Sequence, residues 1–275
     1  MDSKKSFLRW AGSKQKIIPF LKQYWTDNSD RYFEPFMGSA QLFFSLRPKK
    51  AILNDINSDL VQTYLQVQRN PYPVHKILSE MKVSSKEYYR IRSINPNTLG
   101  TNQRAARFIY LNQLCFNGIY RTNLNGEFNV PFSGENQLKT FSLNVLADVS
   151  KKLAKTQIYS DDFEKVVRKH LSKNDFIYLD PPFAVSNRRI FRQYGPDSFG
   201  LDDLARLKKL LDDIDKKGAK FLLSYAYCKE SISLIKNWNS RKLLVQRNVA
   251  GFSKFRRKSA ELLISNIDLK IADEK

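Results

Sequence analysis

Short apolar runs that alternate with longer helical stretches constrain the fold of this chain more than any other feature of its sequence. The runs read RYFEPF, KKAILND, QIYSDDF, DFIYLD, GAKFLLSY, KLLVQR and AELLISN. One intervening stretch, Asp202 to Lys217, begins with acids, carries leucines at helical spacing and stops before Gly218, as a helix does. Strands alternating with helices of about 10–15 residues are typical of βαβ units. We therefore expect an α/β fold with a mainly parallel sheet.

The middle of the chain interrupts this alternation. From about residue 70 to residue 150, Tyr, Arg and Asn become frequent. KEYYRIRS and RAARFIYLNQL are predicted helices, and TNLNGEFNVPF is a predicted hairpin because Asn125-Gly126 favours a type I′ turn. We predict that residues 1–69 and 151–275 form one domain, and that residues 70–150 form an inserted, mostly helical subdomain.

The charge of the chain indicates a polyanionic partner. Its 47 Lys and Arg residues against 27 Asp and Glu residues give a net charge of +20 and a pI near 9.8. A phosphate backbone is the first candidate, and an anionic membrane surface is the second. No stretch approaches the roughly 20 apolar residues of a membrane span, and MDSKKSFLRWAG lacks the apolar core of a signal peptide. We expect a soluble intracellular protein that meets nucleic acid.

Metal chemistry has little support in the sequence. Only Cys115, Cys228, His75 and His170 offer sulfur or imidazole ligands, and no CxxC pair is present. We expect two ordinary thiols in a reducing compartment and no metal cofactor.

The segment DFIYLDPPF joins a buried strand to a stiff corner. Residues 176–179 are apolar or aromatic, and Asp180 follows where the strand should reach the surface. Pro181 and Pro182 lack a backbone N–H and hold φ near about −65°. The corner therefore fixes one carboxylate, free carbonyls and the ring of Phe183, beside which a small, flat, hydrogen-bonding molecule would fit.

Three other segments offer binding groups, each with a plainer alternative. In FLRWAGSKQKI, Trp10 offers a ring and Lys14 a charge, although a solvated basic N-terminus has the same composition. In YFEPFMGSAQLFF, the turn at Gly38 lets a ligand approach the backbone, unless it is a plain strand–turn–helix junction. It is neither GxGxxG nor a P-loop. In AILNDINSDL, Asp55 lies where nucleotide-binding folds place a ribose acceptor; the alternative is a helix N-cap at Asp55 or Asn57.

The predicted hairpin and the residues before it carry groups suited to DNA. In CFNGIYRTNLNGEFNVPF, Arg121 lies among aromatic and asparagine residues. Arg reads guanine and Asn reads adenine at their base edges, and Phe116 and Tyr120 are candidates to stack on bases or wedge into a duplex. The alternative is a hairpin that only packs on the core.

Taken in order, these segments resemble the Dam-type DNA adenine-N6 methyltransferases (D12 class, alpha-group order) over nearly the whole chain. The resemblance rests on FLRWAGSK, FEPFMGSA, ILNDINSDL, YLNQLCFNGIYRTNLNGEFNVPF, DPPF and RKSAELLISN. This family uses S-adenosylmethionine and commonly methylates adenine in GATC. The resemblance implies a Rossmann-like S-adenosylmethionine-dependent methyltransferase fold, in which residues 70–150 form the target-recognition subdomain.

Positions that match the family's functional segments are expected to share their roles. The catalytic D/N-P-P-Y/F/W segment matches Asp180, Pro181, Pro182 and Phe183. The cofactor-binding positions match Trp10, Ala11, Gly12, Lys14, Glu34, Pro35, Phe36, Gly38, Asp55, Ile56, Asp162, Phe163 and Asp180. The DNA-contacting positions match Arg9, Phe116, Asn117, Ile119 and Arg121, and basic residues of RRIFRQY and KFRRK are expected to touch phosphates.

The resemblance also implies a task for the DPPF corner. Asp180 and the Pro181 carbonyl would accept hydrogen bonds from the amino group of an adenine extruded from the duplex, and Phe183 would stack on the base. Both hydrogen bonds favour a more tetrahedral nitrogen, whose lone pair points at the sulfonium methyl of the cofactor. No metal is needed for this chemistry.

At four positions the chain differs from the usual pattern of the family. Phe183 stands where Tyr is frequent, which keeps the ring, and Arg9 replaces Lys but still donates to guanine. Ala40 replaces the second glycine of a G-x-G turn, and alanine resists positive φ. Tyr225 follows Ser224 where Asn is common.

The expected partner is double-stranded DNA, with no membrane, and a cognate restriction endonuclease is a further candidate. We expect a monomer in the cytoplasm of a bacterial, archaeal or virus-infected cell. Two alternatives stay open: a DNA-binding homologue without catalysis, and a methyltransferase that acts on RNA or on a protein amide nitrogen. The basic, aromatic hairpin with GEFNVPF argues against the second.

Overall fold

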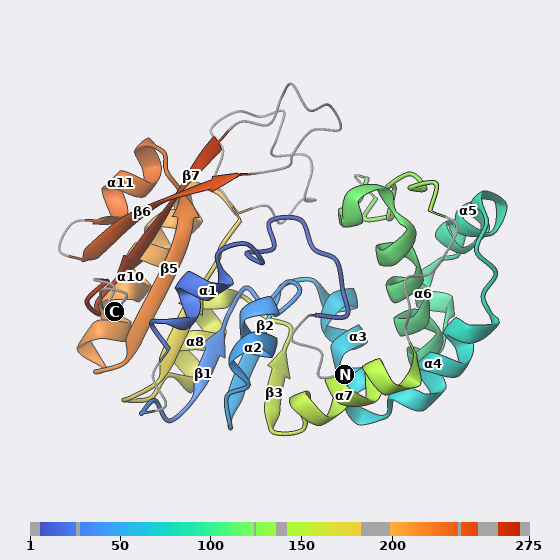
Figure 1. Ribbon diagram of the computed structural model, residues 1–275, viewed down its shortest axis with the longest axis horizontal. Coiled ribbons are helices and arrows are strands. Elements are labelled where there is room, and N and C mark those ends of the chain that lie inside the picture. The colour runs from blue at the N-terminus through green and yellow to red at the C-terminus, as the bar shows by residue number, and fades with distance from the viewer. Residues whose placement is uncertain are drawn as a thin grey trace.

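The computed structural model describes residues 6–25, 28–123, 125–135, 142–182, 199–235, 238–246 and 258–269. Its strands form one seven-stranded sheet in the order β3-β2-β1-β4-β5-β7-β6 (Figure 1). The strands are β1 (Tyr32–Glu34), β2 (Ala51–Asn54), β3 (Thr156–Tyr159), β4 (Phe176–Leu179), β5 (Lys220–Ala226), β6 (Asn239–Gln246) and β7 (Lys258–Ser265). The helices are α1 (Ile18–Lys22), α2 (Gln41–Leu46), α3 (Ser58–Arg69), α4 (Pro71–Glu80), α5 (Ser85–Ser93), η1 (Pro96–Thr98), α6 (Thr101–Leu114), η2 (Phe116–Gly118), α7 (Leu143–Leu153), α8 (Phe163–His170), α10 (Leu201–Lys216) and α11 (Lys229–Ile235).

The sheet is parallel except at one edge. Strands β3, β2, β1, β4 and β5 pair in parallel, whereas β7 pairs antiparallel with both β5 and β6. The parallel part has the strand order of doubly wound, Rossmann-like sheets. The predicted α/β fold with a mainly parallel sheet is therefore confirmed.

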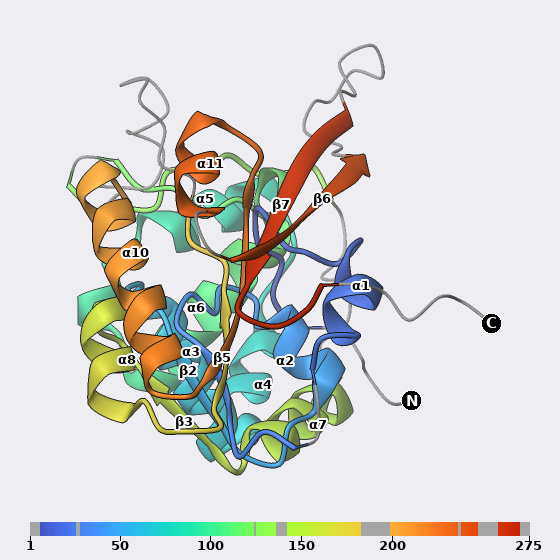
Figure 2. The same cartoon turned by 90° about the vertical axis from the view of Figure 1, so that its left-hand side faces the viewer.

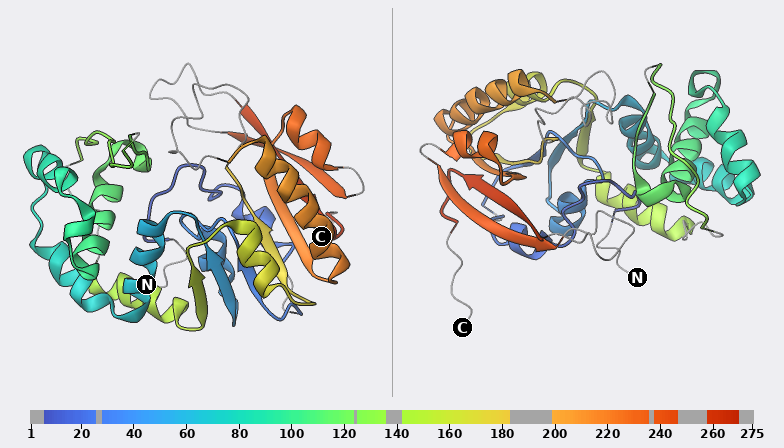
Figure 3. Two further views of the ribbon diagram at one scale, coloured as in Figure 1. Left: turned by 180° about the vertical axis from the view of Figure 1, so that it is seen from behind. Right: turned by 90° about the horizontal axis from the view of Figure 1, so that it is seen from above.

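Side chains of the central strands alternate between two apolar layers. Tyr32 and Phe176 pack in the layer that holds α1, α2 and α3, while their neighbours Phe33 and Ile177 pack against α8 and α10. Figure 2 shows α8 and α10 on one side of the strands and α1 and α2 on the other, and the left view of Figure 3 shows α8 and α10 in front of the sheet. Because helices cover both faces, β1, β2 and β4 are buried at every position rather than at every second one.

Helices α4, α5 and α6 lie together beyond the β3 edge of the sheet (Figure 1). The two helices predicted here, KEYYRIRS and RAARFIYLNQL, correspond to α5 and α6. Arg107 of α6 is buried and donates hydrogen bonds to the carbonyls of Ile91 at 3.0 Å and Arg92 at 2.8 Å. These carbonyls lie at the C-terminal end of α5, where they have no hydrogen-bond donor within the helix. The division of the chain into domains near residues 70 and 150 stays a prediction.

The predicted hairpin after α6 is present, but its predicted turn type is wrong. Thr122 bridges to Phe128 across the hairpin, and Gly126 has φ +78°. The amide of Gly126 donates to the carbonyl of Asn123 at 3.0 Å, whereas a type I′ turn with Asn125 and Gly126 at its centre would be closed by the amide of Glu127. The side chain of Asn123 decides the turn instead, because its Oδ1 accepts hydrogen bonds from the amides of Asn125 and Glu127.

The strand order places a crevice between β1 and β4. From β1 the chain moves outward to β2 and β3, and it then returns to β4 on the other side of β1. In open α/β sheets a ligand binds outside the carboxyl ends of the strands at such a switch point. The segments that follow β1 and β4 therefore lie at the expected site.

Candidate active site

A cavity of about 350 Å³ lies at this switch point. It is lined from the N-terminal segment and from the loops that follow β1, β2, β3 and β4. Every residue predicted to bind the cofactor lines it: Trp10, Ala11, Gly12, Lys14, Glu34, Pro35, Phe36, Gly38, Asp55, Ile56, Asp162, Phe163 and Asp180. The tertiary structure thus brings together residues that lie up to 170 positions apart, between Trp10 and Asp180.

Asp180 directly follows β4, and one of its carboxylate oxygens accepts hydrogen bonds from two protein side chains. Its Oδ1 accepts from Lys14 Nζ at 2.8 Å and from Ser224 Oγ of β5 at 3.1 Å. Burial raises the pKa of Asp180, and the ammonium of Lys14 opposes that shift. Pro181 and Pro182 line the same cavity. Phe183, the fourth predicted catalytic residue, lies outside the described residues.

The loop after β1 presents a buried acid and a glycine with close neighbours. Glu34 Oε2 accepts a hydrogen bond from Tyr32 Oη at 2.8 Å, and burial raises the pKa of Glu34 well above its usual range. Gly38 has φ +46°, and a Cβ there would lie 2.7 Å from Cδ1 of Trp10. Only glycine leaves the indole of Trp10 in its place at the cavity.

Asp55, which directly follows β2, binds a backbone amide of the same loop. Its Oδ2 accepts from the Gly38 amide at 2.9 Å, and its Oδ1 accepts from the Asn57 amide at 3.0 Å. Burial raises the pKa of Asp55, and these two hydrogen bonds oppose the shift. Asn57, not Asp55, caps α3, because its side chain accepts from Leu60 N at 3.0 Å. Of the two N-cap alternatives, the structure assigns the cap to Asn57, and Asp55 faces the cavity.

Aromatic rings form the far wall of the cavity. Phe163, the first residue of α8, has its ring centroid 5.0 Å from that of Phe36 and 5.9 Å from that of Phe199. Asp162 caps α8 by accepting from two amides of its first turn and also pairs with Arg206. Beside the α8 N-terminus the cavity therefore has aromatic rings together with the carboxylate of Asp162.

Asn54 organises these loops, although its sequence context gave no indication of it. The buried side chain donates to the carbonyls of Pro35 at 3.0 Å and Asp161 at 2.9 Å. Its Oδ1 accepts from the Asp161 amide at 3.0 Å. A lone asparagine at a strand end has no pattern that would reveal this role, because both partner loops come from elsewhere in the chain.

The residues predicted to contact DNA lie around η2 and the hairpin. Arg9 approaches η2 closely, since a Cβ on Gly118 would lie 2.5 Å from its own Cβ. Its Nη1 donates to Gln113 O at 3.0 Å and forms an ion pair with Glu135 at 3.4 Å. Arg121 Nε donates to Asn129 Oδ1 across the hairpin at 2.7 Å. The two arginines are therefore held in position by protein groups.

The other three predicted DNA-contacting residues differ in exposure. Phe116 is 48% exposed, and Ile119 is half-buried. Asn117 is exposed and has φ +55°, a left-handed conformation that asparagine tolerates. Phe116 and Asn117 are therefore accessible to a ligand as the structure stands.

The predicted phosphate contacts in RRIFRQY lie outside the described residues, as do those of KFRRK before Lys258.

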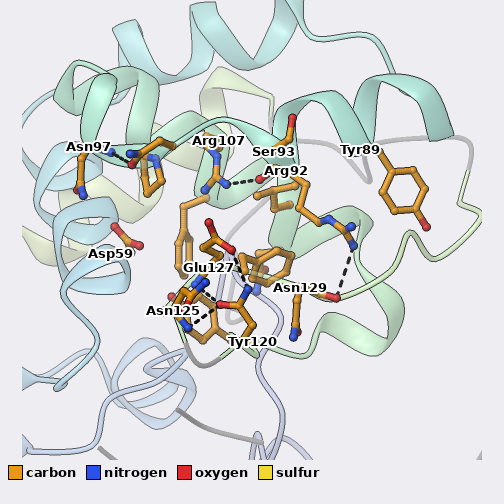
Figure 4. Close-up of a pocket in the computed structure, with 18 residues that line it drawn as sticks. Asp59, Tyr89, Arg92, Ser93, Asn97, Arg107, Tyr120, Asn125, Glu127 and Asn129 are labelled. Atoms are coloured by element: carbon orange, nitrogen blue, oxygen red, sulfur yellow. Dashed lines mark hydrogen bonds between the residues drawn. The ribbon is translucent and has the colours of Figure 1, made fainter. Parts of the chain in front are cut away.

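Tyr120 separates the first cavity from a second one of about 540 Å³ and lines both. Its ring stacks on Trp10 at 5.8 Å and on Phe108 at 5.7 Å. Figure 4 shows it beneath the polar groups of the second cavity, which come from α3, α5, the segment of η1, α6 and the hairpin. Burial raises the pKa of Tyr120 to about 12. The sequence makes Tyr120 a candidate to stack on DNA bases, but in the structure its half-buried ring stacks on Trp10 and Phe108.

The described residues offer neither a candidate metal centre nor a candidate membrane-spanning helix. They contain no group of three or more His, Cys, Asp or Glu side chains arranged to hold a metal ion. Among their helices, none has the length and apolar character needed to cross a membrane.

Comparison with known proteins identifies one family whose model matches this chain and several relatives with similar sequences. The model of the D12 class N6 adenine-specific DNA methyltransferase family matches residues 10–250. The Type II methyltransferase M1.LlaDCHI of Lactococcus lactis subsp. cremoris is 33% identical over 269 residues, which cover 94% of each chain. The DNA adenine methylase of Escherichia coli (strain K12) is 28% identical over 272 residues, which cover 96% of this chain and 95% of the methylase. Among solved structures, precorrin 8w decarboxylase of Methanobacterium thermoautotrophicum superposes on this chain with a TM-score of 0.42 at 9% sequence identity. The superposition covers 94% of this chain and 92% of the decarboxylase chain.

Proposed function

This chain belongs to the D12 class of N6 adenine-specific DNA methyltransferases, and we propose that it methylates an adenine extruded from duplex DNA, within the sequence GATC. The methyl donor is S-adenosylmethionine. The observation that carries the proposal is the position of Asp180, which follows the switch-point strand β4 and faces a cavity lined by every predicted cofactor residue.

The cavity has the groups that S-adenosylmethionine requires. The rings of Phe36 and Phe163 suit the adenine of the cofactor, and Asp55 can accept hydrogen bonds from ribose hydroxyls with its remaining lone pairs. Glu34 and Asp180 supply carboxylates beside the positively charged methionine end. When bound, the cofactor supplies an electrophilic methyl group on a sulfonium.

The residues at the corner after β4 would prepare the adenine amino group. Its lone pair is delocalised into the ring, so it is a poor nucleophile until acceptors hold its two hydrogens. Asp180 and the carbonyl of Pro181 supply these acceptors. Holding nitrogen, methyl and sulfur in line contributes about 7–11 kcal/mol to such reactions. Phe183 would add stacking on the base, worth about 1–3 kcal/mol.

The groups around η2 are suited to the reading of GATC. Arg9 and Arg121 each present a guanidinium that can bind the edge of guanine. Exposed Phe116 and Asn117 lie beside them and are suited to enter the space that the extruded base leaves. A cognate restriction endonuclease, the monomeric state and the cytoplasmic location remain predictions.

The decisive experiment measures transfer of a labelled methyl group to short duplexes that contain GATC, GTTC or a shuffled set of adenine contexts. Label on GATC alone supports both the chemistry and the proposed specificity. Label on other adenines supports the chemistry and rejects GATC. No label on any duplex, despite tight binding, would favour a DNA-binding protein without catalysis, and label on RNA alone would favour the other alternative.

The matched variant in this experiment is Asp180→Ala. It should abolish methyl transfer, because the amino group loses its carboxylate acceptor. Binding to the GATC duplex should stay within a few-fold of the wild-type value, since Asp180 lies in the cavity and is not among the residues predicted to contact the duplex. Retained turnover in Asp180→Ala would overturn the catalytic assignment.

A further inference from the structure

A chain of buried polar groups extends from Asp180 into the sheet. Ser224 donates to Asp180 Oδ1, and its own oxygen lies 3.1 Å from the hydroxyl of Tyr178 on the neighbouring strand. Ser224 is fully buried and Tyr178 nearly so. The hydroxyl of Tyr178 therefore donates to Ser224, which in turn donates to the carboxylate.

The second group that engages Asp180 is an ammonium shared between two acids. Lys14 Nζ lies 2.8 Å from Asp180 Oδ1 and 3.6 Å from Glu261 Oε1 of β7. Lys14 is 7% exposed and Glu261 is 3% exposed, so solvent screens neither charge strongly. The antiparallel edge of the sheet thus brings a residue from near the C-terminus to the switch point.

The two oxygens of Asp180 consequently have different surroundings. Both donors, Lys14 and Ser224, contact Oδ1. A carboxylate whose one oxygen is held by two donors cannot rotate without breaking both hydrogen bonds. The second oxygen is therefore presented in a defined direction at the cavity.

We propose that Ser224 and Glu261 are positioning residues, which anchor Oδ1 of Asp180 directly and through Lys14, and leave Oδ2 to accept the hydrogen bond from the adenine amino group. This inference rests on the proposed function. Ser224 and Glu261 do not touch the substrate; they determine the orientation and the charge of the group that does.

The arrangement predicts opposite effects on the protonation of Asp180. The hydrogen bond from Ser224 and the charge of Lys14 lower the pKa of Asp180, whereas the negative charge of Glu261 raises it. Methyl transfer requires the ionised carboxylate, so the acid limb of the rate profile follows this pKa. Removal of the Ser224 hydroxyl should move that limb to higher pH, and neutralisation of Glu261 should move it to lower pH.

The test is the single-turnover rate of methyl transfer as a function of pH, at saturating duplex and S-adenosylmethionine, for wild type, Ser224→Ala and Glu261→Gln. Glu80→Gln, at the exposed end of α4, removes an acid far from the site and should leave the profile unchanged. Thermal unfolding of each variant establishes that it folds. Ser224→Ala removes a single oxygen, so it remains informative if Glu261→Gln does not fold.

Midpoints that move in opposite directions would support the inference. Slower rates with unmoved midpoints would mean that Ser224 and Glu261 serve only packing, and would overturn it. Shifts of both midpoints in the same direction would also overturn it, because the charge of Glu261 would then not act on Asp180. If wild type transfers no methyl group to any DNA, the proposed function itself fails, which is a different outcome from an active enzyme with unshifted variants.

Discussion

At the scale of single residues, the turn after β1 contains two small residues with the same backbone conformation but different space around their Cα atoms. Gly38 and Ala40 both have positive φ, at +46° and +48°. At Ala40 the left-handed conformation costs about 1–2 kcal/mol, but its methyl group is fully buried, which returns about 0.8 kcal/mol. Alanine is therefore tolerated where the family often has glycine. At Gly38 the indole of Trp10 leaves no room for a methyl group.

Gly38→Ala should weaken cofactor binding and stability together. Its Cβ would lie 2.7 Å from the Trp10 ring, so Trp10 must leave the wall of the cavity. We expect the dissociation constant for S-adenosylmethionine, measured by calorimetry, to rise at least about tenfold, or 1.4 kcal/mol. Gly126→Ala is the matched control, because it also has positive φ but open space around the added Cβ. Equal cofactor affinity in the two variants would show that the contact with Trp10 is unimportant.

At the scale of secondary-structure elements, the site depends on loops that follow neighbouring parallel strands. Asn54 ties the loop after β1 to the loop after β3 through three hydrogen bonds with backbone groups. Parallel strands end at one edge of the sheet, so these loops are adjacent in space although they are more than 100 residues apart in sequence, as Pro35 and Asp161 are. Their relative position is thus set by a side chain and not by a covalent connection.

Asn54→Ala should loosen this arrangement. One buried and two part-buried backbone groups would lose their partner, and each group left unsatisfied costs about 1–3 kcal/mol when buried. We expect the free energy of unfolding in urea to fall by at least about 2 kcal/mol, and affinity for S-adenosylmethionine to fall with it. Asn70→Ala, which removes the N-cap of α4, should lower stability without changing cofactor affinity. Unchanged cofactor affinity in Asn54→Ala would refute the role given to Asn54.

At the scale of the whole molecule, the dominant feature is the net charge of +20. A charge of this size affects association with a polyanion far more than it affects the fold. The two cavities lie on either side of Tyr120, and the groups proposed to read DNA border this region. The protein therefore combines a long-range attraction for DNA with a small number of side chains that select the sequence.

Duplex binding should weaken steeply with salt. Each phosphate contact releases counterions and contributes about −0.9 to the slope of log K against log salt concentration. We expect a clearly negative slope in fluorescence-anisotropy titrations, and the same slope for Asp180→Ala, because that variant keeps the basic surface. A slope near zero would contradict a role for the net charge in phosphate binding.

The sequence by itself determined the elements and the chemistry of this protein. The apolar runs predicted the parallel strands, because alternation of strand and helix is a local property of the chain. The two prolines after Asp180 likewise predicted a rigid corner, since the covalent ring of proline fixes its own φ. Every residue predicted at the cofactor site lines one cavity, because the segments that resemble the family carry these side chains in order.

Only the tertiary structure decided how these side chains act on one another. Nothing near Glu261 or Ser224 in the sequence indicates that they lie beside Lys14 and Asp180, because the strand order β4-β5-β7 creates that proximity. The turn of the hairpin was also mispredicted, because the side chain of Asn123 outweighs the Asn-Gly preference. Such contacts join residues far apart in the chain or compete with local preferences, and their outcome depends on packing that no short segment contains.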